Sequence, residues 1–184
     1  MQARALMGLV ELHILEQAYR AADPRIQTIL RLKPPSAVRR RTLMLKADIA
    51  ARRLQTHQAL SIYAKVIEQH PGSGEAVAAA LHSAKLQHVS GAYHAAEATV
   101  ESLLKQNPGP SERVAHKLQN VPHQGLNLHV VRRSWSDQAH WLKAWAAHRQ
   151  DQPPERTAQI LAAIRTGSKL APGARYWQAR LIAS

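Results

Sequence analysis

The sequence predicts an all-α protein in which helix-turn-helix units stack into a right-handed α-solenoid with a divergent helical cap at the C-terminus. Two observations carry this fold class: a 37-residue repeat, and a first part of the chain with few aromatic side chains. Phe is absent and all four Trp follow residue 134, so Ala, Leu, Ile and Val must fill the N-terminal core. Such a core suits closely packed helices better than a sheet sandwich, which favours β-branched and aromatic residues.

The repeat is a pattern of one small residue, three apolar residues and a closing proline. It occurs three times in steps of 37 residues, at Ala22, Ile26, Ile29, Leu30 and Pro34, at Ala59, Tyr63, Val66, Ile67 and Pro71, and at Ala96, Val100, Leu103, Leu104 and Pro108. A fixed period of this length is typical of helical repeat architectures. The pattern predicts three units, at about residues 1–36, 37–73 and 74–110.

Each unit is expected to contain two helices, of which the second unit gives the clearest example. One helical face of its first helix carries Leu43, Ala47, Ala50 and Leu54. A second apolar stripe follows a turn at residues 55–57 and runs over residues 59–67. Packing of the two helices against each other covers only part of the apolar surface of the pair. Neighbouring units must therefore stack to bury the remaining faces.

Beyond the third repeat the period fails, and residues 111–184 are expected to form a degenerate helix pair and capping helices. The pattern predicts a helix over residues 111–121 and further helices from Ser136 and from Pro154. The Pro172-Gly173 pair is expected to separate the last helix from the one before it. A terminal unit of unusual composition is compatible with an array, because its outer face meets water.

The three units resemble the tetratricopeptide repeat family over residues 3–108. The matching motif positions are Ala47, Ala59, Tyr63, Val66 and Pro71 in the second unit, and Ala84, Ala96, Val100, Leu103 and Pro108 in the third. The first unit has Val10 at the small position, and Asp23-Pro24 lies where its second helix should already be running. The family's helix-A Trp and Tyr are missing, and each period is longer than the family's 34 residues. The extra residues follow the closing proline, so the loops between units are expected to be long.

The sequence offers no catalytic or metal-binding motif, so we expect no enzyme activity, no metal site and no cofactor. The chain has no Cys, which excludes thiolate nucleophiles, disulfides and Cys-containing zinc sites. Its 11 His include no pair spaced i,i+3 or i,i+4, and there is no Gly-rich phosphate loop. Trp141 and Trp145 are four residues apart, a spacing more typical of a helical core than of a ligand-stacking platform.

Positive charge is concentrated in one part of the chain. The 25 Lys and Arg outnumber the 12 Asp and Glu, which gives a formal charge of +13, and residues 20–53 alone contribute +8. Arg39, Arg40, Lys46 and Arg53 form what we call the basic patch, on the predicted first helix of the second unit. The patch is interpreted as a solvated face or as a nucleic-acid site, although it lacks the interleaved aromatic residues that stack RNA bases. A membrane surface is a third candidate partner.

The family resemblance implies a binding groove. In the family the first helix of each unit lines a concave surface, and the corresponding positions here are Arg4, Met7, Glu11, Arg41, Met44, Asp48, Arg52, Leu81, Lys85 and His88. Apolar Met and Leu beside cationic side chains suit a peptide that bears acidic residues. The resemblance therefore implies a non-catalytic scaffold or adaptor that binds a protein or peptide partner, with RNA binding through the basic patch as the alternative. The family variant that clamps a carboxylate with Asn is not supported, because no Asn precedes Asn107.

The opening residues and the overall hydropathy bear on location. No stretch of about eighteen apolar residues occurs, so no transmembrane segment is expected. Glu11 and His13 interrupt the apolar run near the N-terminus, so no signal peptide is expected and a cytoplasmic location is favoured. The sequence leaves the oligomeric state open.

Overall fold

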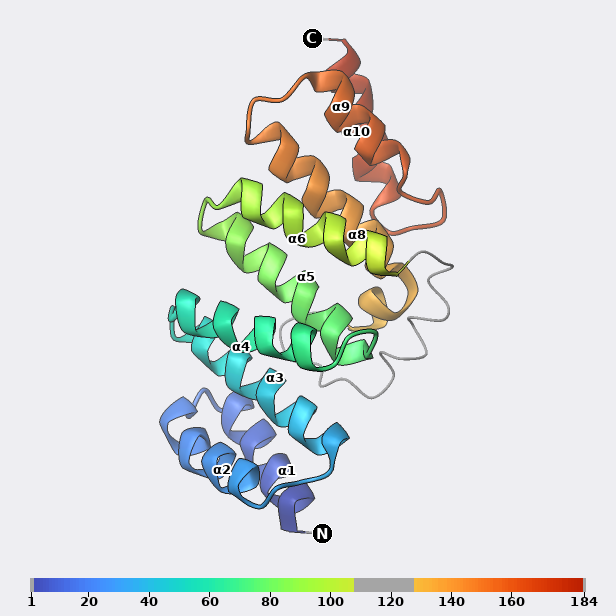
Figure 1. Ribbon diagram of the computed structural model, residues 1–184. Helices are drawn as coiled ribbons and strands as arrows, with labels where there is room; N and C mark the ends of the chain where they lie inside the picture. Colours follow the sequence, from blue (N-terminus) through green and yellow to red (C-terminus); the bar gives the residue numbers. More distant parts are fainter. Residues whose placement is uncertain (1, 108–127, 184) are drawn as a thin grey trace.

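Six helices form three antiparallel pairs in the first part of the chain (Figure 1). The computed structural model describes residues 2–107 and 128–183. The pairs are α1 (Gln2–Leu15) with α2 (Tyr19–Arg31), α3 (Ser36–Arg52) with α4 (Thr56–Gln69), and α5 (Gly74–Val89) with α6 (Tyr93–Gln106). The later helices are α8 (Leu128–His148), α9 (Pro154–Ala162) and α10 (Ala171–Ile182). No strand occurs in the described residues, and the predicted all-α class is confirmed.

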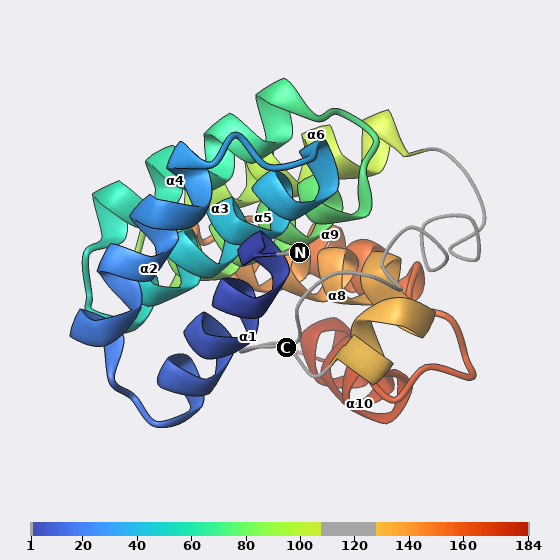
Figure 2. The ribbon, with the colours of Figure 1, turned by 90° about the horizontal axis from the view of Figure 1, so that it is seen from below.

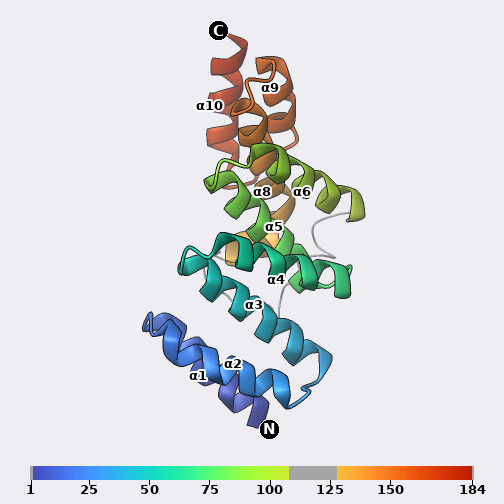
Figure 3. The same ribbon diagram turned by 60° about the vertical axis from the view of Figure 1, so that its left-hand side comes forward.

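The helix pairs stack into a solenoid. Successive described helices pack against each other, and α1, α3, α5 and α8 also contact one another in that order. These four helices form an inner layer, and α2, α4 and α6 cover its outer side, as the view along the stack shows (Figure 2). The two termini lie at opposite ends of the array (Figures 1 and 3). The predicted helical repeat architecture is therefore confirmed.

The turn inside each pair repeats with the same period as the apolar pattern. One residue of the turn has a positive φ, and a following N–H donates back across the end of the first helix, which is the Schellman arrangement. The positive-φ residues are Gln17, Leu54 and Gly91, with φ of 58°, 59° and 80°, and each lies 37 residues after the last. The same turn joins α8 to α9, where Asp151 has φ of 52° and the Gln152 N–H donates to the Ala147 carbonyl. The α8–α9 pair thus keeps the turn geometry of the earlier pairs.

Small residues allow the two layers to approach closely. Ala22, Ala59 and Ala96 lie on the second helix of each pair and are 0%, 0% and 1% exposed. The core is divided into three clusters, which span α1 to α3, α3 to α6 with α8, and α8 to α10. Because the clusters cross the boundaries between pairs, each pair covers an apolar face of its neighbour.

Three details of the helices differ from the sequence predictions. Leu54 is 88% exposed and lies in the turn, so it does not belong to the core face of α3. The helix expected from Ser136 begins earlier, at Leu128. Pro172 and Gly173 lie inside the first turn of α10 and do not precede it, because proline is tolerated where backbone N–H groups have no helical partner.

Two further predictions concern the ends of the repeat segment. α2 continues through Asp23-Pro24, as the 37-residue register requires, with Pro24 inside the helix. The helix expected over residues 111–121 lies outside the described residues. Within the part of the chain that the structure describes, no helix is both long enough and apolar enough to cross a bilayer.

Candidate functional site

The ten residues assigned to the groove all lie on α1, α3 and α5, but they differ in exposure. Arg4, Arg52 and Lys85 are exposed, and Glu11, Arg41 and His88 are partly exposed. The buried ones are Met7, Met44, Asp48 and Leu81, which are 8%, 2%, 6% and 1% exposed. All the charged positions except Asp48 therefore reach the surface, while Met44 and Leu81 are almost completely buried.

Met44 and Leu81 are core residues, which corrects their assignment to the groove. Both belong to the cluster that spans α3 to α6 and includes residues of α8. The same cluster contains Ala47 and Ala84, each 0% exposed, and these small side chains let neighbouring helices close over the larger ones. A partner on the inner layer therefore has no access to Met44 or Leu81.

A groove of about 660 Å³ opens where α1, α3 and the start of α5 meet. It is lined from α1 by Arg4, Met7, Gly8 and Glu11, from α3 by Ala37, Val38, Arg40 and Arg41, and from the α4–α5 connection and α5 by Gly72, Ser73, Gly74 and Glu75. The groove brings together Arg4, Met7, Glu11 and Arg41, four of the ten predicted positions. Arg52, Lys85 and His88 are not among its lining residues.

Two ion pairs hold the walls of this groove in place. Arg41 of α3 donates to the Glu11 carboxylate of α1. Arg40 of α3 lies 3.2 Å, Nε to Oε2, from Glu75 of α5, a carboxylate whose side chain is only 8% exposed. The pairs connect α3 to both neighbours, and charged groups in partly buried surroundings are screened less than exposed ones. Arg4, by contrast, forms no ion pair with a described residue and is exposed at the rim.

A second polar cluster, Asp48, Tyr63 and His82, joins three consecutive helices. The Tyr63 hydroxyl of α4 donates to Asp48 Oδ1 of α3. His82 Nδ1 of α5 lies 3.5 Å from that carboxylate oxygen and 3.4 Å from the Tyr63 oxygen. Sequence reasoning assigned Asp48 to the groove and did not anticipate its partners. The available signal was Tyr63 itself, a polar-tipped side chain at a repeat position held by Ile26 and Val100 in the other units.

Burial dominates the titration of this cluster. It raises the pKa of Asp48 above the usual aspartate value, against the opposing effects of His82, Tyr63 and Arg52. It also lowers the pKa of His82, with Asp48 acting in the opposite direction. Burial and the neighbouring carboxylate together raise the pKa of Tyr63 well beyond that of a free phenol. Burial thus favours the uncharged form of each of the three side chains. A buried cluster of this kind suits a structural link between helices better than a catalytic group.

One buried carboxylate links the C-terminal helices to the repeats, and another links the C-terminal segments to each other. Glu97 of α6 is 7% exposed and accepts hydrogen bonds from Gln150 at 3.0 Å, Gln152 at 3.3 Å and Arg156 at 2.7 Å. Asp137 of α8, which is 1% exposed, accepts from both the backbone and the guanidinium of Arg165. Sequence reasoning missed these links because their partners lie far apart in the chain.

The Trp residues after position 134 belong to helix packing. Trp141 and Trp145 of α8 meet edge to face with ring centroids 5.8 Å apart, and Trp145 meets Trp177 of α10 at 4.9 Å. Trp141 and Trp177 pack against the cluster that joins α8, α9 and α10. These contacts favour the interpretation of the Trp pair as core.

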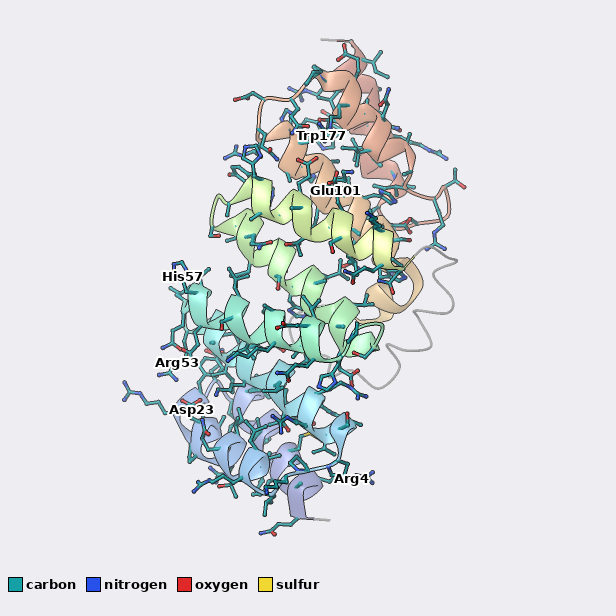
Figure 4. The ribbon with its side chains drawn as sticks, in the orientation of Figure 1. Arg4, Asp23, Arg53, His57, Glu101 and Trp177 are labelled. Carbon is teal, nitrogen blue, oxygen red and sulfur yellow. The ribbon has the colours of Figure 1, made fainter. Side chains whose placement is uncertain are left out.

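The basic patch is partly neutralised. Arg53 donates to Asp23 at 2.7 Å, and Arg40 is occupied by Glu75, which leaves Arg39 exposed and Lys46 partly exposed. Figure 4 shows Arg53 and Asp23 together on the edge of the array opposite Arg4. Of the four patch residues only Arg40 also lines the groove, while Arg39, Lys46 and Arg53 lie outside it. Among the described residues there is also no group of three or more His, Cys, Asp or Glu side chains that could hold a metal ion.

Residues 52–120 match the family model of the tetratricopeptide repeat. The match begins at the end of α3, includes α4, α5 and α6, and confirms the family resemblance for this part of the chain. No curated protein and no solved structure matches the chain significantly.

Proposed function

We propose that this protein is a non-catalytic scaffold or adaptor that binds an acidic segment of a partner protein on its inner layer. The observation that carries the proposal is the groove between α1, α3 and the start of α5. Arg4, Glu11 and Arg41, three positions that the family resemblance assigns to ligand contact, line this single opening. Tetratricopeptide repeats typically serve as protein-interaction scaffolds, which agrees with the family match over residues 52–120.

The charges around the groove support an acidic partner. Its lining holds the cations Arg4, Arg40 and Arg41 against the carboxylates of Glu11 and Glu75, an excess of one positive charge. The whole chain carries a formal charge of +13, which accelerates the encounter with an acidic partner and disfavours a basic one. A segment longer than the groove would meet further exposed cations on the inner layer, at Arg52 and Lys85.

Nucleic-acid binding through the basic patch is the second candidate function. The observation in its favour is the charge of +8 carried by residues 20–53. It ranks second because Arg40 and Arg53 are engaged by Glu75 and Asp23. RNA would have to displace these carboxylates or rely on Arg39, Lys46 and other nearby cations.

The two functions differ in which charges they need and in how strongly they depend on salt. We suggest fluorescence anisotropy over a salt series with two labelled probes, a short Glu-rich peptide and a short single-stranded RNA. The expected result is peptide binding that is weakened more by Arg4→Glu than by Arg39→Glu combined with Lys46→Glu, although the double variant removes more positive charge. RNA binding that loses affinity with log salt at a slope of about −0.7 per phosphate contacted, and that disappears in the double variant, would favour the second candidate instead.

A further inference from the structure

We infer that the groove holds a bulky apolar side chain of the partner in the space above Gly8, next to an acidic residue that pairs with Arg4. This inference rests on the proposed function and adds to it the kind of sequence that the groove selects. Gly8 of α1 is a residue that the helical pattern gives no reason to expect.

Gly8 creates open space on an otherwise regular helix. It lies inside α1 (Gln2–Leu15), is exposed, and a Cβ built on it would meet no heavy atom within 4 Å. Glycine in a helix interior is less favourable than alanine, and no positive φ or tight contact requires it here. The missing side chain leaves room in the groove that any larger residue would occupy.

The surroundings of Gly8 are apolar on one side and cationic on the other. Met7 and Val38, each 8% exposed, and Ala37 line the groove beside it. These side chains give a floor against which an aliphatic or aromatic group can lose its contact with water. The sequence-predicted apolar contacts, Met44 and Leu81, are buried elsewhere, so this is where the groove itself offers apolar surface to a partner.

Arg4 is placed to recognise an acid beside that apolar group. It precedes Gly8 by four residues, which puts the two positions on the same face of α1, one turn apart. The other lining guanidinium groups, Arg40 and Arg41, are already engaged by Glu75 and Glu11. An incoming carboxylate can therefore pair with Arg4 without breaking an ion pair of the described residues. A basic side chain of the partner beside Arg4 would be repelled by Arg4, Arg40 and Arg41, the three arginines that line the groove.

The inference is tested with three labelled peptides that share one Ser-Gly framework. The first carries a central Leu flanked by Glu, the second replaces this Leu with Ser, and the third replaces the Glu residues with Lys. Binding of each is measured by fluorescence anisotropy to the full chain and to the variants Gly8→Leu, Gly8→Ala and Arg4→Glu. Gly167→Leu is the matched control, because a Cβ at Gly167 also meets nothing within 4 Å and this residue lies outside the groove.

We expect the Leu-Glu peptide to bind best, with affinity reduced about tenfold or more by Gly8→Leu, the effect of losing one buried aliphatic side chain. Arg4→Glu should weaken it as well, Gly8→Ala should have a smaller effect, and Gly167→Leu should have none. Gly8→Leu remains folded in this account, because leucine favours a helix more than glycine does, and thermal unfolding checks this.

The outcomes separate the inference from the proposed function. Equal binding of the Leu and Ser peptides, or unchanged binding to Gly8→Leu, overturns the apolar site while acidic-peptide binding stands. Failure of both Glu-containing peptides to bind the unaltered chain overturns the proposed function and the inference together. Tighter binding of the Lys peptide contradicts the role of Arg4.

Discussion

Buried polar side chains act as specific links between neighbouring helices in this protein. Asp48, Tyr63 and His82 come from three different helices and meet in one cluster. A buried polar group without a partner costs about 1 to 3 kcal/mol, so the cluster favours the one stacking arrangement that pairs its members. The apolar and alanine-rich core around it is less selective, because small aliphatic side chains tolerate several packings.

The His82 imidazole is expected to make stability depend on pH. Burial lowers its pKa in the folded state, while in the unfolded chain it titrates near 6.5. The unfolded state therefore binds a proton first as the pH falls, and the free energy of unfolding should decrease from pH 7 to pH 5. His82→Gln should reduce this slope in urea unfolding experiments. Part of it should remain, since burial also lowers the pKa of His88 and His140.

One control variant and the opposing contribution of Asp48 belong to this experiment. His94→Gln, at an exposed position of α6, should leave the slope as it is. Asp48 has the opposite sign, because its pKa is raised: its contribution is present below the unfolded value near 3.9 and is lost as the pH rises through the folded value. If the free energy of unfolding fell equally from pH 7 to pH 5 in the unaltered protein and in His82→Gln, the proposed contribution of His82 would be contradicted.

Ala59 and Ala96 are expected to tolerate no larger residue. Both are almost fully buried, at 0% and 1% exposed, where the second helix of a pair packs on its neighbours. Replacing either by Leu overfills the site and should lower the free energy of unfolding by about 1 to 3 kcal/mol. Ala64→Leu, at an exposed position of α4, is the matched control and should change little. Urea unfolding curves that coincide for Ala59→Leu and Ala64→Leu would rule out this packing.

At the scale of helices and turns, the 37-residue period is a property of the backbone as well as of the apolar pattern. The turns at Gln17, Leu54 and Gly91 share a left-handed residue and the same backward hydrogen bonds. A residue with a Cβ atom is sterically strained in the left-handed backbone region, at positive φ, whereas glycine is not. The third turn therefore has the residue best suited to its geometry, and the first two do not.

This difference predicts a stabilising substitution. Leu54 has φ of 59° and is 88% exposed, so Leu54→Gly relieves backbone strain without removing a core contact. We expect a gain of about 1 kcal/mol, and a comparable loss for Gly91→Leu, from the cost of the left-handed region for L-residues. Val89→Gly, at an exposed position of α5 with helical backbone, is the control and should destabilise. A lower melting temperature for Leu54→Gly would contradict the turn assignment.

The helices of the repeats follow from the sequence because their periodicity is local. The small residues and closing prolines predict the pairs, and the helices α2, α4 and α6 begin 37 residues apart, at Tyr19, Thr56 and Tyr93. Leu54 was misassigned because an apolar side chain in a turn has the same sequence signature as one on a helix face. Pro172 was misassigned because proline both ends helices and occupies their first turn.

At the scale of the whole molecule, stacking turns local repeats into an elongated array with a continuous inner layer (Figure 3). Core clusters run across the pair boundaries, so no pair is buried by itself. The α8–α9 pair extends this layer, since α8 contacts α5 and α6. Glu97 of α6 also accepts hydrogen bonds from Gln150 in the α8–α9 turn and from Arg156 of α9. Lys and Arg side chains lie on the surface of this array, and some of them form ion pairs with carboxylates.

The groove could be predicted from the sequence only in part. The family resemblance assigns Arg4, Glu11 and Arg41 to ligand contact, and the structure brings these three together. Met44 and Leu81 have the same register, but close helix packing buries them, which depends on the size of side chains on other helices. Gly8 escaped notice because a missing side chain contributes nothing to an apolar or charged pattern.

The central claim is that an acidic segment binds the inner layer at the groove. It is tested most directly by amide hydrogen exchange of the full chain with and without the Leu-Glu peptide, because exchange reports which backbone segments a ligand stabilises. The account predicts slower exchange in residues 4–11 of α1, residues 37–41 of α3 and residues 72–75 before and at the start of α5. Protection confined to residues 20–33 and 46–53, with no change in α1, would contradict it.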